Sequence, residues 1–186
     1  MAHWMALPRV SRMRFDADPA AARLQALLPP VSRAPRVPPA SLRKLRPLAR
    51  IVASASGRLT GTEPLAIFTT LGRHPRLFRS WLFYSTRLMP FGTLPRRDAE
   101  LLILRVAWQC GAAYEWWHHV PLALRAGLRP EEIAAAAGAP PTAGLSERRR
   151  VLIAITDDVR SGRTEKLLTR WAARETKACR REPSHT

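Results

Sequence analysis

Apolar residues recur three and four positions apart along most of the chain, and no segment alternates between apolar and polar residues as a strand would. The repeat is clearest between residues 76 and 92, on the helical face formed by Leu77, Trp81, Tyr84 and Leu88. The sequence therefore predicts an all-α fold. Its apolar helix faces are expected to pack together in a compact bundle or to be covered in an oligomer.

Pro, Gly, Ser and Thr interrupt this pattern where helices are expected to begin and end. Helices are predicted at residues 18–28, 41–57, 62–75, 76–92, 96–111, 112–128, 129–140, 146–162 and 164–175. Pro47 is expected to begin or kink the second of them, and Gly57 to close it. Past Gly111, residues 112–128 are either a separate helix or a kinked extension of the preceding one. The proline-rich stretch 29–39 is expected to be irregular.

Three regions differ in composition: a basic, Pro-rich N-terminal arm with one or two helices (1–61), a helical domain (62–175) and a polar tail (176–186). No apolar run approaches the roughly 18 residues of a membrane helix, and the N-terminus does not read as a signal peptide. The two cysteines, Cys110 and Cys179, do not suggest a disulfide framework. We therefore expect a protein of the cytoplasm with no membrane partner.

The formal net charge of +17 indicates a nucleic acid or another anionic partner. However, only three of the 31 basic residues are lysines, and an Arg-, Ala- and Pro-rich composition also arises from a GC-rich genome. Residues 122–140 scan like the first part of a helix-turn-helix, but Pro140 and Pro141 interrupt the chain where a recognition helix should follow. DNA binding is thus the weaker alternative, and no nucleic-acid partner is expected.

The segment "QCGAAYEWWHHVPLALRAGL" (109–128) concentrates chemically versatile side chains. Glu115 and His119 stand four positions apart, so they share one face of a helix. A proton-transfer site needs a carboxylate, a histidine and a surface that excludes water, and a kink at Gly111 could bring Glu100 across to them. The alternative is that Glu115 and His119 form a surface ion pair while the tryptophans fill the core.

Metal and dithiol chemistry find less support. His118 and His119 are adjacent and diverge by about 100° on a helix, so no metal site is expected. Cys110 has Ala113 where the resolving cysteine of a C-x-x-C motif would stand. It is interpreted as a small buried apolar residue.

Residues 93–133, "TLPRRDAELLILRVAWQCGAAYEWWHHVPLALRAGLRPEEI", resemble the carboxymuconolactone decarboxylase and alkylhydroperoxidase D-like family, and the resemblance extends over about residues 62–160. It implies an all-α bundle that forms a homo-oligomer, a trimer or a hexamer. Redox members carry Glu-x11-Cys-x-x-Cys-x3-His. Anchored on Glu100, this pattern places Ala112 and Glu115 at the two cysteine positions and His119 at the histidine. The chain thus resembles a "YEW..H" branch without the dithiol, and it looks shortened at its C-terminus.

For that branch the resemblance implies acid–base chemistry, decarboxylation or tautomerisation, on a small carboxylated or carbonyl substrate without a cofactor. His119 is then the proton shuttle, Glu115 its partner or base, Glu100 an orienting group and Tyr114 a donor to a developing oxyanion. Four more residues are expected around the substrate pocket: Trp116, which would exclude water, His118, Arg105 and Cys110.

Two alternatives to this function stay open. One is peroxiredoxin- or alkylhydroperoxidase-like antioxidant activity through Cys110, and the other is a catalytically inactive structural member of the family. Arg105 could clamp a substrate carboxylate, but pairing with Glu100 or Asp98 is the favoured interpretation.

Overall fold

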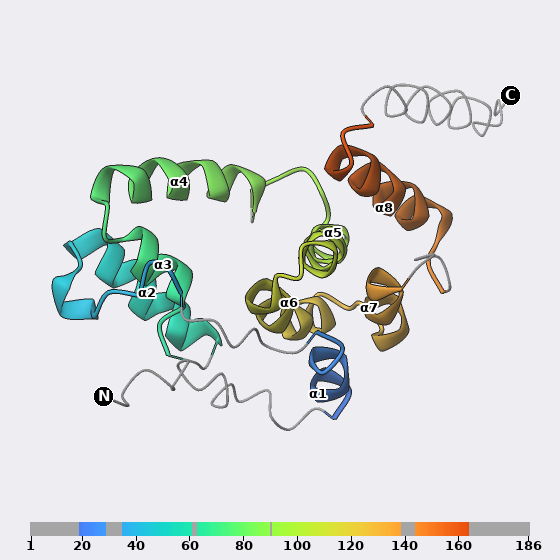
Figure 1. The fold of residues 1–186 in the computed structure, drawn as a ribbon, viewed down its shortest axis with the longest axis horizontal. Coiled ribbons are helices and arrows are strands. Elements are labelled where there is room, and N and C mark those ends of the chain that lie inside the picture. The colour runs from blue at the N-terminus through green and yellow to red at the C-terminus, as the bar shows by residue number, and fades with distance from the viewer. Residues whose placement is uncertain (1–18, 29–34, 61–62, 90, 139–143, 164–186) are drawn as a thin grey trace, which may run out of the picture. The chain divides into compact units, whose positions relative to one another are not determined.

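The computed structural model describes residues 19–28, 35–60, 63–89, 91–138 and 144–163. These residues form eight α-helices, one short 3-10 helix and no strand, which confirms the all-α prediction (Figure 1). The elements are α1 (Pro19–Gln25), η2 (Leu42–Lys44), α2 (Pro47–Thr60), α3 (Ala66–Leu71), α4 (Pro75–Leu88), α5 (Arg96–Gln109), α6 (Ala113–Arg125), α7 (Pro130–Ala137) and α8 (Glu147–Arg160). No described helix has the length and apolar character needed to cross a bilayer. The helix predicted at 164–175, the tail and Cys179 lie outside the described residues.

Proline and glycine set several helix boundaries. Pro47 begins α2, but the prediction that Gly57 closes this helix is wrong, because α2 continues to Thr60 with Gly57 buried inside it. Gly111 has a φ of 61°, a left-handed conformation that costs other residues about 1–2 kcal/mol. The chain turns there, so residues 112–128 contain a separate helix, α6.

Two compact units account for the chain: residues 1–23 with 30–96, and residues 24–29 with 97–186. The boundary expected between residues 61 and 62 falls inside the first unit. In that unit α2, α3 and α4 pack around a core of Leu45, Ala49, Ala53 and Phe78. A Cβ at Gly72 would lie 2.7 Å from the carbonyl oxygen of Phe68. Only glycine therefore permits this close packing.

The second unit contains α5 to α8. Its largest fully buried side chains are Trp116, Leu101, Leu104, Ile133, Ile153, Glu100, Glu132 and Val120. Two of its buried carboxylates lie among arginines. Arg149 on α8 contacts both of them, Asp98 on α5 at 3.1 Å and Glu132 on α7. Ion pairs therefore connect three helices of this unit.

Helix α6 continues through Pro121, which has no N–H to donate to the carbonyl of Trp117 one turn earlier. The side-chain amide of Gln25 donates to that carbonyl instead, at 2.9 Å. The indole N–H groups of Trp116 and Trp117 donate in turn to the carbonyls of Leu24 and Leu28, each at 2.8 Å. Residues 24–28 thus satisfy three polar groups of α6 that the helix itself cannot.

Candidate functional site

His119 lies between two carboxylates. Its Nδ1 is 2.7 Å from Oε2 of Glu100 on α5, and its Nε2 is 3.4 Å from Oε2 of Glu115, one turn earlier on α6. The turn at Gly111 brings α5 back against α6, as the sequence suggested a kink there would do. The three residues expected to form the acid–base site are therefore in contact.

The two carboxylates decide the charge of the imidazole. Burial lowers the pKa of His119, but the hydrogen bonds to Glu100 and to Glu115 outweigh it and raise this pKa to about 9. The same bond to His119 holds the pKa of Glu115 below its usual value, although burial opposes that. At neutral pH the site therefore holds a protonated imidazole beside an ionised Glu115.

The two sides of the imidazole differ in exposure. The Glu100 side chain is 0% exposed, whereas 15% of the His119 side chain and 39% of the Glu115 side chain are accessible. The Glu115 side of the imidazole is therefore the more accessible side of the site, and the Glu100 side is closed.

His118 points to different partners. Its Nδ1 lies 2.7 Å from the carbonyl oxygen of Tyr114, and the two rings pack with their centroids 4.2 Å apart. Burial is the main cause that lowers the pKa of His118, so this ring is neutral at pH 7.

Among the described residues, no group of three His, Cys, Asp or Glu side chains is arranged to hold a metal. The oxyanion role of Tyr114 stays a prediction.

Two expected environments need correction. Trp116 was expected to wall off a substrate pocket, but its side chain is wholly buried, packs beside Trp108 and donates to the carbonyl of Leu24. Trp116 is therefore a core residue, and its role in excluding water from a substrate pocket stays a prediction. Cys110 was expected to be buried, but its thiol is free and exposed, because the residue directly follows the last turn of α5 at the Gly111 bend.

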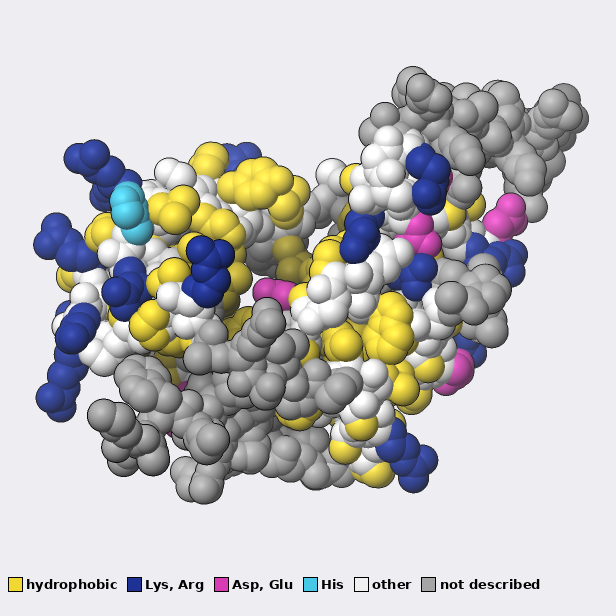
Figure 2. Space-filling model, viewed as in Figure 1, with side chains coloured by type: hydrophobic (Ala, Val, Ile, Leu, Met, Phe, Trp, Pro, Cys, Tyr) yellow, Lys and Arg dark blue, Asp and Glu magenta, His cyan; other side chains and the backbone are white. Residues whose placement is uncertain are grey.

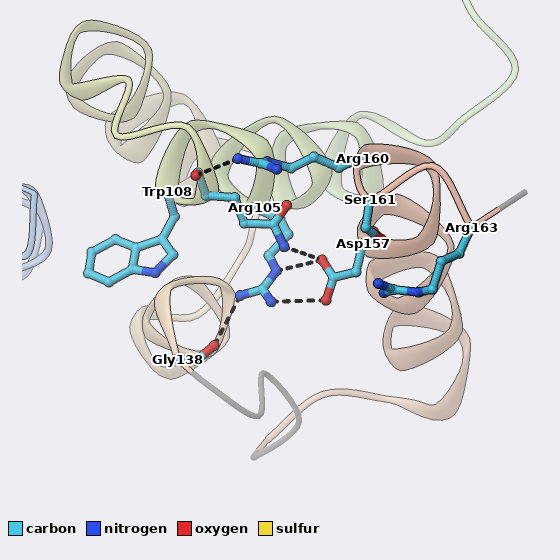
Figure 3. A pocket seen from close by; sticks show the side chains of 8 residues that line it. Arg105, Trp108, Gly138, Asp157, Arg160, Ser161 and Arg163 are labelled. Carbon is cyan, nitrogen blue, oxygen red and sulfur yellow. Dashed lines mark hydrogen bonds and ion pairs between the residues drawn. The ribbon is translucent and has the colours of Figure 1, made fainter.

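Arg105 is paired, as favoured, but its carboxylate partner is Asp157 on α8, 52 positions away, rather than an acid at the start of its own helix. Its Nε and Nη2 donate to the two oxygens of Asp157 at 2.8 and 2.9 Å (Figure 3). Its Nη1 donates to the carbonyls of Ala136 and Gly138, both at 3.0 Å. Asp98, the other expected partner, is held by Arg148 and Arg149. Arg105 thus joins α5, the end of α7 and α8.

The hollow around Arg105 has a volume of about 520 Å³, and its lining includes Gln109, Asp157 and Arg160 but none of Glu100, Glu115 and His119. Gln109 donates to Asp157 at 2.6 Å, and Arg160 donates to the backbone carbonyl of Gln109 at 2.9 Å. Asp157 and Gln109 were not predicted from the sequence, because residues 48 and 52 positions apart carry no local signal of their contact. The structure does not bring Arg105 into the His119 site.

Residues 75–158 match the family model described as the carboxymuconolactone decarboxylase family. The matched segment begins with α4 and ends two residues before the end of α8, and it contains Glu100, Glu115 and His119. No curated protein and no solved structure matches the chain.

Proposed function

We propose that the protein, whose residues 75–158 match the model of the carboxymuconolactone decarboxylase family, is an acid–base enzyme acting on a small carboxylated or carbonyl substrate. The observation that carries the proposal is the protonated imidazole of His119, held between Glu100 and Glu115 with Nε2 at the accessible edge. A proton donor with a fixed orientation and an adjacent carboxylate is the minimum that such chemistry requires.

In a decarboxylation, the bond between the substrate carboxylate carbon and the adjacent carbon breaks, and carbon dioxide leaves. The bonding electron pair moves into a neighbouring carbonyl as an enolate. His119 then donates its Nε2 proton to the carbon that lost the carboxylate, which gives the product and a neutral imidazole. Glu115, in contact with both Nε2 and solvent, lies where a proton from water can return to the ring.

In a tautomerisation, the ionised Glu115 removes a proton next to the carbonyl, and His119 protonates the far end of the resulting enolate. Glu115 thus accepts a proton from the substrate, and His119 donates one to it. Glu100 touches neither substrate nor solvent, so it is a positioning residue, which fixes the ring and favours its charged form.

The proposal is tested with β-keto acids and carboxylated lactones, by following carbon dioxide release and substrate absorbance. His119→Gln retains an amide N–H for Glu100 and removes the acid, so it should fold and lose at least about a hundredfold in kcat. Glu100→Gln should keep KM and shift the pH profile. Activity should fall as the pH rises through the pKa of His119, because the acid form is lost. Full activity of His119→Gln would refute the proposal.

A thiol peroxidase is a second candidate, because the Cys110 thiol is free and exposed. Turnover of peroxide with a thiol reductant, lost in Cys110→Ser and retained in His119→Gln, would favour it. If neither set of substrates reacts while the protein remains folded, the third alternative, an inactive structural member, is favoured.

A homo-oligomer, a trimer or a hexamer, is also part of the proposal. The exposed apolar side chains of α4 support it, since Leu77, Phe83, Tyr84 and Leu88 are each more than half exposed. Light scattering should give a mass of three or six chains of 20.9 kDa. A monomer at micromolar concentration would contradict this part of the proposal.

A further inference from the structure

Two helix N-termini meet at one hollow of the first unit. A pocket of about 420 Å³ is lined by Arg46, His74, Pro75, Arg76 and Arg79. Arg46 immediately precedes α2, and its carbonyl accepts the N–H of Arg50 at 3.0 Å. His74 is the N-cap of α4, whose first residue is Pro75. The pocket therefore lies at the starts of two helices of 14 residues each.

Both helix starts make this hollow electropositive, because the N-terminus of a helix carries a partial positive charge. The His74 side chain also lines the hollow. Its Nδ1 accepts the backbone N–H of Leu77 at 3.3 Å, so a neutral ring carries its proton on Nε2. Neither helix has an acidic residue in its first turn to offset this field.

The three arginines of the pocket also have no acidic counterpart. Among the described residues, none of Arg46, Arg76 and Arg79 forms an ion pair with an Asp or Glu side chain. Residues 35–96 contain ten arginines and one lysine, and Glu63 is the only acid in that range of the sequence. Lys and Arg side chains line the edge of the molecule where α2, α3 and α4 lie (Figure 2). The paired arginines of α8 provide a contrast within the same chain.

We propose that this pocket binds the phosphate group of a small phosphorylated molecule. Guanidinium groups match phosphate oxygens in pairs, and helix N-termini are common phosphate sites, so the pocket combines both kinds of donor. Its volume falls in the range of small-molecule sites. The pocket shares no residue with the His119 site, so the inference stands apart from the proposed function.

The test is calorimetric titration of the full chain with inorganic pyrophosphate and with glycerol phosphate, in low-salt chloride buffer. Arg76→Ala with Arg79→Ala should weaken binding of both probes by at least about tenfold, since it removes two charge-assisted partners. The matched control is Arg43→Ala with Arg58→Ala, which removes the same charge from exposed positions of the same unit outside the pocket. It should weaken binding by no more than about twofold through the general field. Circular dichroism of both variants checks that the helices remain.

Three results would overturn the proposal. One is equal weakening by the two double variants, which would mean that diffuse charge attracts the anion. Another is the absence of binding of either probe to the wild type. The third is selective binding of a twelve-residue oligothymidylate that is weakened equally by both double variants, which would favour a nucleic-acid surface instead.

Discussion

The Nδ1 atom of His119 and Oε2 of Glu100 lie 2.7 Å apart across nineteen positions of sequence. Glu100 is wholly buried, so water could not take the place of the imidazole as a partner of this carboxylate. A histidine in such a place would ordinarily be neutral, because burial disfavours its charge. The second carboxylate, Glu115, helps to reverse that tendency.

The titration of His119 tests this reversal directly. Its ring C–H signals in NMR should report a pKa of about 9, and those of His118 a pKa below 6.5, because only His119 contacts two carboxylates. Glu115→Gln should lower the pKa of His119 by removing one of the two. A wild-type His119 that titrates below pH 7 would contradict the proposed acid role.

The same shift predicts how stability depends on alkaline pH. The pKa of His119 is higher in the folded chain than its usual 6.5. The contacts of the protonated imidazole with Glu100 and Glu115 therefore contribute fully to the free energy of unfolding below about pH 6.5, and this contribution is lost as the pH rises through about 9. Denaturant unfolding at pH 6.5, 8 and 9.5 should show this decline. His119→Gln, which does not titrate, should lose most of the dependence, and an unchanged slope in this variant would disprove the assignment.

Acid should weaken the contacts among α5, α7 and α8. Burial raises the pKa values of Asp98 and Glu132, but their arginine partners and the backbone N–H of Arg129 outweigh it and hold both values below the usual range. Their stabilisation is present above about pH 4.5 and is lost as the pH falls through the lowered values. Arg149→Ala should therefore lower the free energy of unfolding by about 2–4 kcal/mol at pH 7 and by less at pH 3.

The neighbouring Arg150 supplies the control for that experiment, since it is exposed on the same helix. Arg150→Ala should change the free energy of unfolding by less than about 0.5 kcal/mol. Equal losses in the two variants would mean that general charge, not the buried carboxylates, makes Arg149 important.

Arg105 should be required for stability and not for substrate binding. Arg105→Lys keeps the charge but cannot donate to both oxygens of Asp157, so it should cost about 1.5–3 kcal/mol in denaturant unfolding. KM should stay within about twofold of the wild type once a substrate is found. A large rise in KM with unchanged stability would restore the interpretation of Arg105 as a carboxylate clamp.

The contact between Gln25 and Trp117 can be isolated through Pro121. Gln25→Ala should cost about 1 kcal/mol, because the carbonyl of Trp117 loses its donor. In a Pro121→Ala background the restored N–H can take that carbonyl within the helix, so the same change should cost much less. Thermal unfolding of the wild type, the two single variants and the double variant gives the coupling free energy between Gln25 and Pro121. Equal costs of Gln25→Ala in both backgrounds would show that Gln25 does not replace the missing N–H of Pro121 as donor to Trp117.

Periodicity and prolines predicted most of the helices, and Gly111 indicated how Glu100 could reach His119. The errors have a common physical origin. The environments of Cys110 and Trp116 depend on which helix face is covered, and that is decided by distant packing. Arg105 likewise found a partner through the position of α8, which no local pattern encodes.

Residues 24–28 form hydrogen bonds with α6, and these bonds decide whether the segment that matches the family model could fold without them. Residues 75–158 hold every member of the proposed acid–base site, yet the helix that carries His119 depends on partners about ninety positions upstream. A piece cut at the limits of the family match would expose one freed carbonyl and two indole N–H groups at once. In this protein the residues of the proposed site span a shorter stretch of chain than the residues that stabilise its helices, so any transplant of the site must include residues 24–28.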